Sequence, residues 1–351
     1  MKNSYLEVNL TNIEYNLNEI KKLTNKEIMP VIKANGYGTY INKNIKFLNK
    51  YNIVAVAEVS EALELRQLGY KKDIFVLNQP YIEDINNILD NNIIVGISSK
   101  EFIKEILNTN MRCHLEIETG MNRTGINLKD LEPLCKIIKN TKLQIEGIYT
   151  HFSSADNDLE YTNKQFNLFK EALNIANNFF NFKYIHTSAS NGILNLKEDI
   201  TNLVRVGIIM YGYPSNDNMN IILKPSTKLI SKINYIKDIE PDTYISYGKT
   251  FKSNKKMTIA TIGIGYGDGI RRSLSNKGHV LINNILCPIV GTICMDSLMV
   301  DISNCNATVG DKVYIWDNKN ITLEEIADMC NTINYEIICN IGNRVERKYV
   351  N

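Results

Sequence analysis

The chain has 351 residues, 44% of them hydrophobic and 22% charged, and its 40 basic and 38 acidic side chains leave a formal net charge of +2. This length is sufficient for a large barrel and a second domain, each with its own core. The balanced charge argues against nucleic acid or an anionic membrane as a partner. No apolar run reaches the ~18 residues of a membrane span and the start "MKNSYLEVNL" is polar, so we expect a cytoplasmic protein.

Seven cysteines are scattered through the sequence without a C-x-x-C pair. This odd number and irregular spacing argue against a disulfide framework and a zinc site, and we predict no metal. We interpret the cysteines mostly as buried small hydrophobes. They are Cys113, Cys135, Cys287, Cys294, Cys305, Cys330 and Cys339.

Short runs rich in Ile and Val alternate with amphipathic helical stretches in the first part of the chain. Helices are expected at Ser60–Gly69, with a serine N-cap, and at Asp158–Phe180, with apolar residues three and four apart. Eight strand–helix units in about 200 residues predict a (β/α)8 barrel with its reactive groups at the C-terminal ends of the strands. The predicted strands are Ile28–Lys33, Ile53–Ala57, Asp73–Leu77, Ile93–Ser98, Arg112–Glu118, Leu143–His151, Tyr184–Ser188 and Leu203–Ile208.

A different pattern begins at about Lys228, where closely spaced apolar runs are separated by Gly, Asp and Asn turns. We therefore predict a barrel domain at 1–227 and a mainly β domain at 228–351. A late helix is expected at Thr322–Met329, since a threonine precedes two glutamates of its first turn. The predicted strand Tyr5–Leu10 precedes the first barrel helix and is free to pair with the β domain.

The stretch "VIKANGYG" places Lys33 where the first barrel strand ends. A desolvated amine near other cations has a lowered pKa and can form a Schiff base with an aldehyde cofactor. Taken alone, a surface lysine at a strand end is the more frequent interpretation. Gly36 and Gly38 flank Tyr37 and allow sharp turns that carry its phenol toward a phosphate.

The segments "HTSASNG" and "VRVGIIMYG" supply Ser190, Gly207 and backbone N–H groups where barrels often hold phosphate. Helix capping by Ser188 or Ser190 is the competing interpretation.

In "HLEIETGMNRTG", the carboxylates of Glu116 and Glu118 share one strand face and are both predicted to point inward. Arg123 is their expected counter-ion, either as a structural ion pair or as a substrate clamp.

The segment "TIGIGYGDGIRR" places Tyr266 between glycines, and taken alone a hairpin turn is the more frequent interpretation of this context. A phenol acts as a base only where hydrogen bonds or cations stabilise its phenolate.

Together these segments resemble the alanine racemase family along nearly the whole chain. The motifs "VIKANGYG", "THFSSAD", "TGMNRTG", "VRVGIIMYG", "ISYGKTF", "GYGDG", "VGTICMD" and "GNRVERKY" stand in the family's order. The resemblance implies a pyridoxal-phosphate enzyme of fold type III, a barrel followed by a β domain, and a homodimer with shared active sites.

The resemblance also implies roles for the two bases that flank the substrate α-carbon. Lys33 is similar to the lysine that binds the cofactor's aldehyde and then works on one face of that carbon. Tyr266 is similar to the base of the opposite face, delivered from the partner subunit. Arg205 resembles the arginine that faces the pyridine nitrogen, and His151 the histidine that links the tyrosine to this arginine. A guanidinium does not readily protonate that nitrogen, which makes the cofactor a weaker electron sink.

Other residues match the family's binding positions. Arg123 is similar to the arginine near the substrate carboxylate and the cofactor's phenolic oxygen. Met295 is similar to the residue whose backbone N–H meets that carboxylate, with Cys294 as a bystander. The phosphate cradle is implied at Tyr37, Ser190, Gly207, Ile208 and Tyr349.

The chain departs from the family at three places, and in one of them "GTY" follows Tyr37 where "GHG" is common and "RVERKY" replaces the usual proline-containing ending near Tyr349. Glu116 stands where many members have a lysine carbamylated by carbon dioxide, and we hypothesise that it replaces the carbamate as an anion that holds Arg123. Thr292 stands where an arginine near the substrate entrance is frequent.

The implied activity is the interconversion of L- and D-alanine, which supplies D-alanine for peptidoglycan. A serine racemase or a dual alanine/serine racemase is the alternative within the family. A fold-type III decarboxylase normally has a glutamate where Arg205 stands. A non-enzymatic pyridoxal-phosphate carrier ends after its barrel, whereas this chain continues through Tyr266 and Met295.

Overall fold

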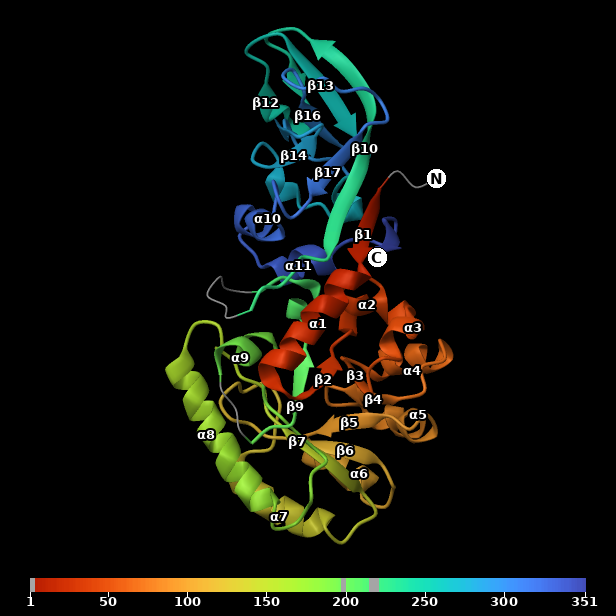
Figure 1. The fold of residues 1–351 in the computed structure, drawn as a ribbon, viewed down its shortest axis with the longest axis vertical. Helices are drawn as coiled ribbons and strands as arrows, with labels where there is room; N and C mark the ends of the chain where they lie inside the picture. Colours follow the sequence, from red (N-terminus) through yellow and green to blue (C-terminus); the bar gives the residue numbers. More distant parts are fainter. Residues whose placement is uncertain (1–3, 197–199, 215–220) are drawn as a thin grey trace.

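The computed structural model describes residues 4–196, 200–214 and 221–351. Eight parallel strands form a barrel in the first region (Figure 1). β3 to β8 pair in chain order, β2 pairs with β9, and a bridge between Val31 and Ala55 joins β2 to β3. A hydrogen bond of 3.1 Å from Arg205 N to Ser188 O joins the last two strands. The bounds are β2 (Glu27–Pro30), β3 (Ile53–Val56), β4 (Asp73–Val76), β5 (Ile94–Ile97), β6 (Arg112–Glu116), β7 (Gln144–Tyr149), β8 (Tyr184–His186) and β9 (Leu203–Val206).

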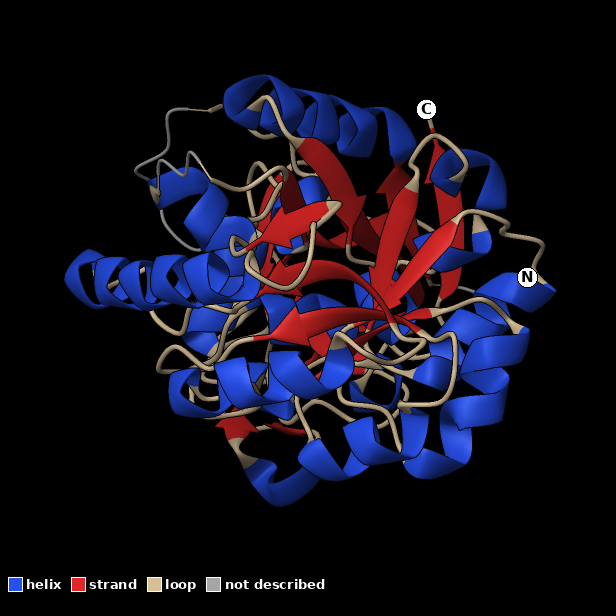
Figure 2. Ribbon diagram, turned by 90° about the horizontal axis from the view of Figure 1, so that it is seen from below, coloured by secondary structure: helices blue, strands red, loops and turns tan. Residues whose placement is uncertain are grey.

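Helices surround these strands, as the view in Figure 2 shows. All residues of β3, β5 and β9 are buried, which is typical of parallel strands covered on both faces. The predicted (β/α)8 barrel is confirmed. Its helices are α1 (Leu10–Thr24), α2 (Lys33–Tyr37), α3 (Ile45–Leu48), α4 (Val59–Gln67), α5 (Ile85–Asp90), α6 (Lys100–Ile106), α7 (Leu128–Ile138), α8 (Leu159–Ala176) and α9 (Ser190–Asn195).

Two predicted barrel helices differ from the structure at their ends. Asp158 caps α8 by accepting a hydrogen bond of 2.8 Å from Tyr161 N, as the sequence indicates, but the helix ends at Ala176. The predicted serine cap of α4 is wrong. The cap is Glu58, because the Glu61 carboxylate accepts from the backbone N–H of Ala57 and Glu58 at 2.7 and 3.2 Å and starts the helix at Val59.

The second region is mainly β and contains an eight-stranded sheet. Six of its strands pair in the order β15-β14-β17-β10-β1-β18, and β13 pairs with both β10 and β16. The strand β1 (Tyr5–Asn9) pairs antiparallel with β10 and parallel with β18, so the N-terminal strand belongs to this sheet. The remaining elements are β10 (Thr227–Ile239), β11 (Tyr244–Ile245), β12 (Phe251–Lys252), β13 (Met257–Ile262), β14 (His279–Ile282), β15 (Ile285–Pro288), β16 (Leu298–Asp301), β17 (Lys312–Trp316), α10 (Leu323–Met329), α11 (Asn334–Cys339) and β18 (Glu346–Val350).

The helix α10 has the predicted Thr322 cap, which accepts from Glu325 N at 3.1 Å. The helix α11 lies where the second region meets the barrel and packs against α2. This contact brings the second region to the carboxyl end of the barrel strands. Within the described residues, no helix is long and apolar enough to cross a membrane.

Candidate active site

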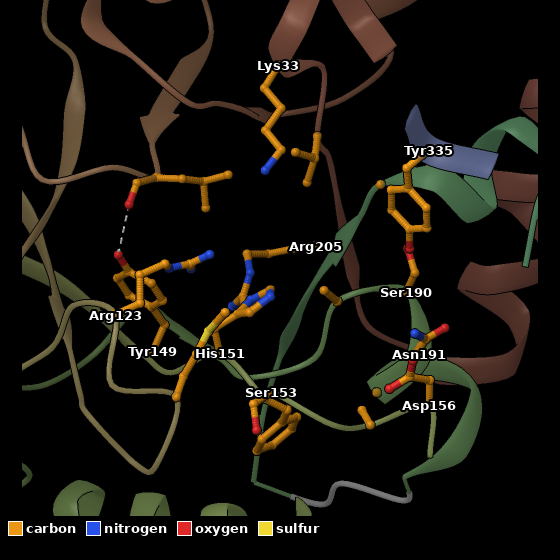
Figure 3. Close-up of a pocket in the computed structure, with 18 of the residues that line it drawn as sticks. Lys33, Arg123, Tyr149, His151, Ser153, Asp156, Ser190, Asn191, Arg205 and Tyr335 are labelled. Atoms are coloured by element: carbon orange, nitrogen blue, oxygen red, sulfur yellow. Dashed lines mark hydrogen bonds between the residues drawn. The ribbon is translucent and has the colours of Figure 1, made fainter. Parts of the chain in front are cut away.

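A cavity of about 300 Å³ lies at the carboxyl ends of the barrel strands (Figure 3). Most of the residues that the sequence nominates for cofactor and substrate binding line it, although they come from segments far apart in the chain. These lining residues are Lys33, Tyr37, Arg123, His151, Ser190, Arg205 and Gly207.

Lys33 begins α2 three residues after β2 ends at Pro30, in a tight left-handed turn. Ala34 and Gly36 have φ values of 52° and 61°, and Ala34 N donates to the Glu61 carboxylate at 2.6 Å. Burial lowers the pKa of the Lys33 amine, and the nearby Arg123 lowers it further against the opposing pull of Glu61. An amine with a lowered pKa is a better nucleophile toward an aldehyde near neutral pH.

Tyr37 extends from the same turn to the backbone of Gly207. A Cβ atom on Gly207 would stand 2.5 Å from the Tyr37 hydroxyl and 3.6 Å from Ser190 Oγ, so only glycine leaves this space open. Burial raises the pKa of Tyr37, which keeps its phenol a hydrogen-bond donor. Ser190 is the first residue of α9, whose N-cap is Ala189, so the competing interpretation of Ser188 or Ser190 as the helix cap is wrong. Ile208 follows Gly207 and begins a 3-10 turn, Ile208–Tyr211.

Arg205 is a buried cation on β9, with 2% of its surface exposed. Its Nη2 shares two hydrogens among three acceptors, the carbonyls of Thr150 and Thr187 at 2.9 and 2.7 Å and His151 Nδ1 at 3.0 Å. A guanidinium has no acceptor, so Nδ1 of His151 accepts and the imidazole proton lies on Nε2. Burial, reinforced by Arg205, lowers the pKa of His151 well below its usual value and keeps this histidine neutral.

The structure corrects the predicted inward pair of carboxylates. Glu116 is 4% exposed and accepts from Thr124 Oγ1 at 2.8 Å. Glu118 instead accepts from the loop N–H of Gly120, and from that of Asn122 at 2.8 Å. The physical reason is that β6 ends at Glu116, so the strand alternation does not extend to Glu118.

Arg123 is exposed, and no ion pair joins it to either carboxylate in the part of the chain that the structure describes. Burial raises the pKa of Glu116, whereas the Thr124 hydrogen bond and attraction by Arg123 lower it. Arg123 therefore acts on Glu116 through longer-range attraction.

Tyr266 and Met295 do not line the cavity of their own chain. They lie together in the second region, where Tyr266 N donates to Cys294 O and Gly267 N to Met295 O, both at 2.9 Å. Their side chains are 43% and 54% exposed. Thr292 is 4% exposed and donates to Tyr247 O at 2.9 Å, so it does not face an entrance in this chain.

Tyr349 is a second correction. Its hydroxyl donates to the carbonyl of Tyr40 at 2.7 Å, and its strand pairs with β1 at Val8, so the side chain does not line the cavity. An aromatic residue that sequence reasoning missed, Tyr335 of α11, lines the cavity instead. Its ring centroid lies 6.2 Å from that of Tyr37, and its hydroxyl points toward Ser190 in Figure 3.

No local signal in the sequence marks Tyr335, because its helix belongs to the second region and reaches the cavity only through tertiary packing. The phenols of "NYEIIC" and "RKY" lie close in the sequence, and only the fold distinguishes them.

The cavity fits the three reactive parts of pyridoxal phosphate: an amine for its aldehyde, hydroxyls and backbone N–H groups for its phosphate, and a fixed donor for its ring nitrogen. Fold and site together define a pyridoxal-phosphate enzyme built on a barrel. Residues 8–215 match the sequence model of "Alanine racemase, N-terminal domain", and residues 226–349 that of "Alanine racemase, C-terminal domain". The chain belongs to the alanine racemase family and is an amino-acid racemase.

Individual relatives agree along the full length. The chain is 37% identical to an alanine racemase of Methanococcus maripaludis over 99% of this chain and 98% of that protein. It is 38% identical to one of Clostridium novyi, over 99% and 95% of the two chains.

Solved structures agree as well. The alanine racemase of Clostridium difficile 630 superposes with a TM-score of 0.93 at 35% identity, over 100% of this chain and 96% of that one. An alanine racemase of Bartonella henselae with covalently bound pyridoxal phosphate gives 0.90 at 28% identity, over 99% of both chains. One of Bacillus anthracis with bound L-Ala-P gives 0.93 at 33% identity, over 100% and 96%.

Proposed function

We propose that this protein interconverts L- and D-alanine with two bases, Lys33 and the Tyr266 of a second copy of the chain. The observation that carries the proposal is the separation of two groups within one chain. The amine lies in the cavity, while Tyr266 and Met295 lie together and exposed in the other region. Such an exposed phenol is available to supply a second base to the cavity of another copy.

The side chains of the cavity have distinct tasks in this proposal. When bound, the cofactor supplies an aldehyde and a ring that withdraws electrons from the substrate α-carbon. Lys33 binds that aldehyde and then exchanges a proton with one face of the carbon. Tyr37, Ser190 and the backbone at Gly207 and Ile208 hold the phosphate.

Arg205 orients the ring through its nitrogen, and it donates a hydrogen bond without giving up its proton. His151 presents its Nε2 proton as a donor, since Nδ1 already accepts from Arg205. This donor is suited to stabilise the phenolate of an incoming Tyr266. Racemisation then needs a proton removed on one face and returned on the other.

At the mouth of the cavity, Arg123 is the cation for the substrate carboxylate, and the backbone N–H of Met295 joins it from the second copy. Alanine is the proposed substrate because the relatives named above are alanine racemases and one holds L-Ala-P. Serine differs from alanine by one hydroxyl, and a small pocket discriminates poorly against it unless a polar group interacts with that hydroxyl. The product D-alanine would serve peptidoglycan synthesis in the cytoplasm.

Mixing two inactive variants tests the shared site. Lys33→Ala and Tyr266→Phe should each abolish racemisation of alanine. When both are co-expressed, each mixed dimer contains one site with both bases. With random pairing, activity should return to roughly a quarter of the wild-type value, since half the dimers are mixed and each has one of two sites intact. Activity that stays absent in purified mixed dimers would show that the bases do not act across subunits.

A panel of L-amino acids separates alanine from serine. Each is incubated with the holoenzyme in deuterated water, and both D-product and α-deuterium are measured. We expect the highest kcat/KM for alanine. A higher kcat/KM for serine would replace alanine as the substrate while leaving the two-base proposal in place.

A further inference from the structure

Two fully buried histidines stand in a row behind Arg205, away from the cavity. His186 of β8 and His114 of β6 are both 0% exposed. Arg205 Nη1 lies 2.7 Å from His186 Nδ1, and His186 Nε2 lies 2.9 Å from His114 Nδ1. Neither histidine lines the cavity, and the activity proposed above does not use them.

The chemistry of the row fixes the position of every proton in it. A guanidinium only donates, so His186 Nδ1 must accept and the proton of this imidazole lies on Nε2. That proton is donated to His114 Nδ1, which leaves the His114 proton on Nε2. Both rings are therefore neutral, and protonating Nδ1 of His186 would break its bond to Arg205.

Packing holds the rings where this pattern requires them. Phe75 stacks on His114 with centroids 4.6 Å apart, and Tyr149 lies parallel to His186 at 4.9 Å with an interplanar angle of 2°. A Cβ on Gly147 would stand 2.6 Å from the His114 ring, so the barrel leaves space for this imidazole.

The far end of the row costs stability. Among the described residues, His114 Nε2 is buried and has no hydrogen-bond partner. A buried N–H that has lost its bond to water is unfavourable. An apolar side chain at this position would remove that cost, but it would also leave His186 Nε2 without an acceptor.

We infer that His114 and His186 are positioning residues that hold the Arg205 guanidinium in one orientation for the cofactor ring. This inference rests on the proposed role of Arg205. His186 supplies the acceptor that fixes Nη1, and His114 supplies the acceptor that fixes the His186 ring. The row keeps the positive charge on Arg205 alone. Burial lowers the pKa of both histidines, for His114 to about 3, which agrees with two neutral rings.

The test compares two substitutions at His114 in the holoenzyme. His114→Asn places an amide oxygen on Cγ, at the position of the imidazole Nδ1, and so keeps an acceptor for His186. His114→Leu has a similar volume and no acceptor. We expect the Asn variant to keep kcat and the cofactor's absorption spectrum within about threefold and without a band shift. We expect the Leu variant to lose about tenfold in kcat with little change in KM, and to shift the absorption band, because the His186 ring that fixes Nη1 of Arg205 has lost its own acceptor.

Equal behaviour of the two variants, whether both intact or both impaired, would overturn the inference. The absorption spectrum does not depend on which amino acid is racemised, so it remains informative if alanine proves to be the wrong substrate.

A second measurement uses the wild-type holoenzyme and needs no folded variant. The chain has 4 histidines, of which His279 is exposed and serves as an internal reference. With ¹⁵N-labelled histidine at pH 7, nitrogen chemical shifts should place His114 and His186 in the neutral form with the proton on Nε2. A proton on Nδ1 of either ring, or a charged imidazolium, would contradict the proton pattern and the inference with it.

Discussion

At the scale of the residue, the site depends on how burial changes the charge of individual groups. The Lys33 amine loses part of its preference for a proton because it is desolvated and faces Arg123. Arg205 keeps its charge because a guanidinium is held by carbonyls and imidazoles on several sides. The sequence predicted Lys33 at a strand end, and the resemblance to the family, not local pattern, assigned its role and that of Arg205. The sequence could not predict that the Glu118 carboxylate binds loop N–H groups, since a single backbone rotation after the end of β6 turns this side chain away from the barrel interior.

Lys33→Ala should leave the protein folded and lower racemase activity by at least about a thousandfold, because the group that holds the cofactor covalently is gone. Borohydride reduction of the holoenzyme followed by intact mass measurement checks this. The wild-type chain should gain the mass of the reduced cofactor and the variant should not. Lys50→Ala, at an exposed ion pair with Glu14, is the matched control. Cofactor mass on the Lys33→Ala chain would contradict the assignment.

Glu116→Gln should change both substrate affinity and the pH dependence of stability. Burial raises the folded pKa of Glu116 above its unfolded value of about 4.3, so ionising it costs stability as the pH rises from that value through the folded pKa. The amide does not titrate. The free energy of unfolding of the variant relative to wild type should therefore increase across this window and then stay constant.

Urea unfolding at several pH values measures this difference, with the exposed Glu83→Gln as the control. If Glu116 also holds Arg123 as a permanent anion, KM should rise several-fold in the variant. A variant as fast and as tight-binding as wild type would contradict that hypothesis for Glu116.

At the scale of the element, the turn of α2 and the helix α11 meet closely. Gly38 has a φ of 76°, and a Cβ at this position would stand 2.5 Å from Ile338 O. The turn carries both Lys33 and Tyr37, so the approach of α11 helps to set their positions. The barrel strands were predictable because short runs rich in Ile and Val are typical of buried parallel strands. Contacts between α2 and α11 join residues about 300 positions apart, and no local pattern encodes them.

Gly38→Ala should lower the free energy of unfolding by about 2 kcal/mol or more, since it adds both a strained φ and a collision with backbone. Gly69→Ala is a matched control, because Gly69 also has a positive φ, 93°, but nothing within 4 Å of the added Cβ. The difference between the two variants in urea unfolding isolates the collision. If both variants lose the same free energy of unfolding, α11 shifts at little cost to accommodate the added Cβ atom. We also expect the first variant, and not the second, to release its cofactor faster.

At the scale of the whole molecule, the second region contributes to the barrel's cavity through Tyr335, which packs against Tyr37. Sequence patterns divided the chain into a barrel and a β region. They could not indicate which aromatic residue of the β region lines the cavity. Tyr349 was chosen in its place from the resemblance at the C-terminal motif. Its pairing with β1 explains why that choice was wrong.

Tyr335→Phe should keep the ring contact with Tyr37 and remove a hydroxyl that points toward Ser190. We expect cofactor affinity to fall by about three- to tenfold, the loss expected for one hydrogen bond, while kcat at saturating cofactor stays within about twofold. Titrating the apoenzyme with pyridoxal phosphate measures the affinity. Tyr81→Phe, at a side chain that is 77% exposed, is the control. Unchanged affinity would remove Tyr335 from the cofactor's surroundings.

The position of β1 between β10 and β18 has a consequence for how the chain folds during synthesis. The partners Tyr5 and Glu346 are 341 positions apart (346 − 5), whereas the barrel lies wholly between them. At ~5–20 residues per second, β1 waits on the order of 20–70 s for β18 to leave the ribosome. The barrel can therefore form first, with an unpaired strand at its start. Removing either β1 or β18 would leave its partner strand at an open sheet edge, which is a site for aggregation.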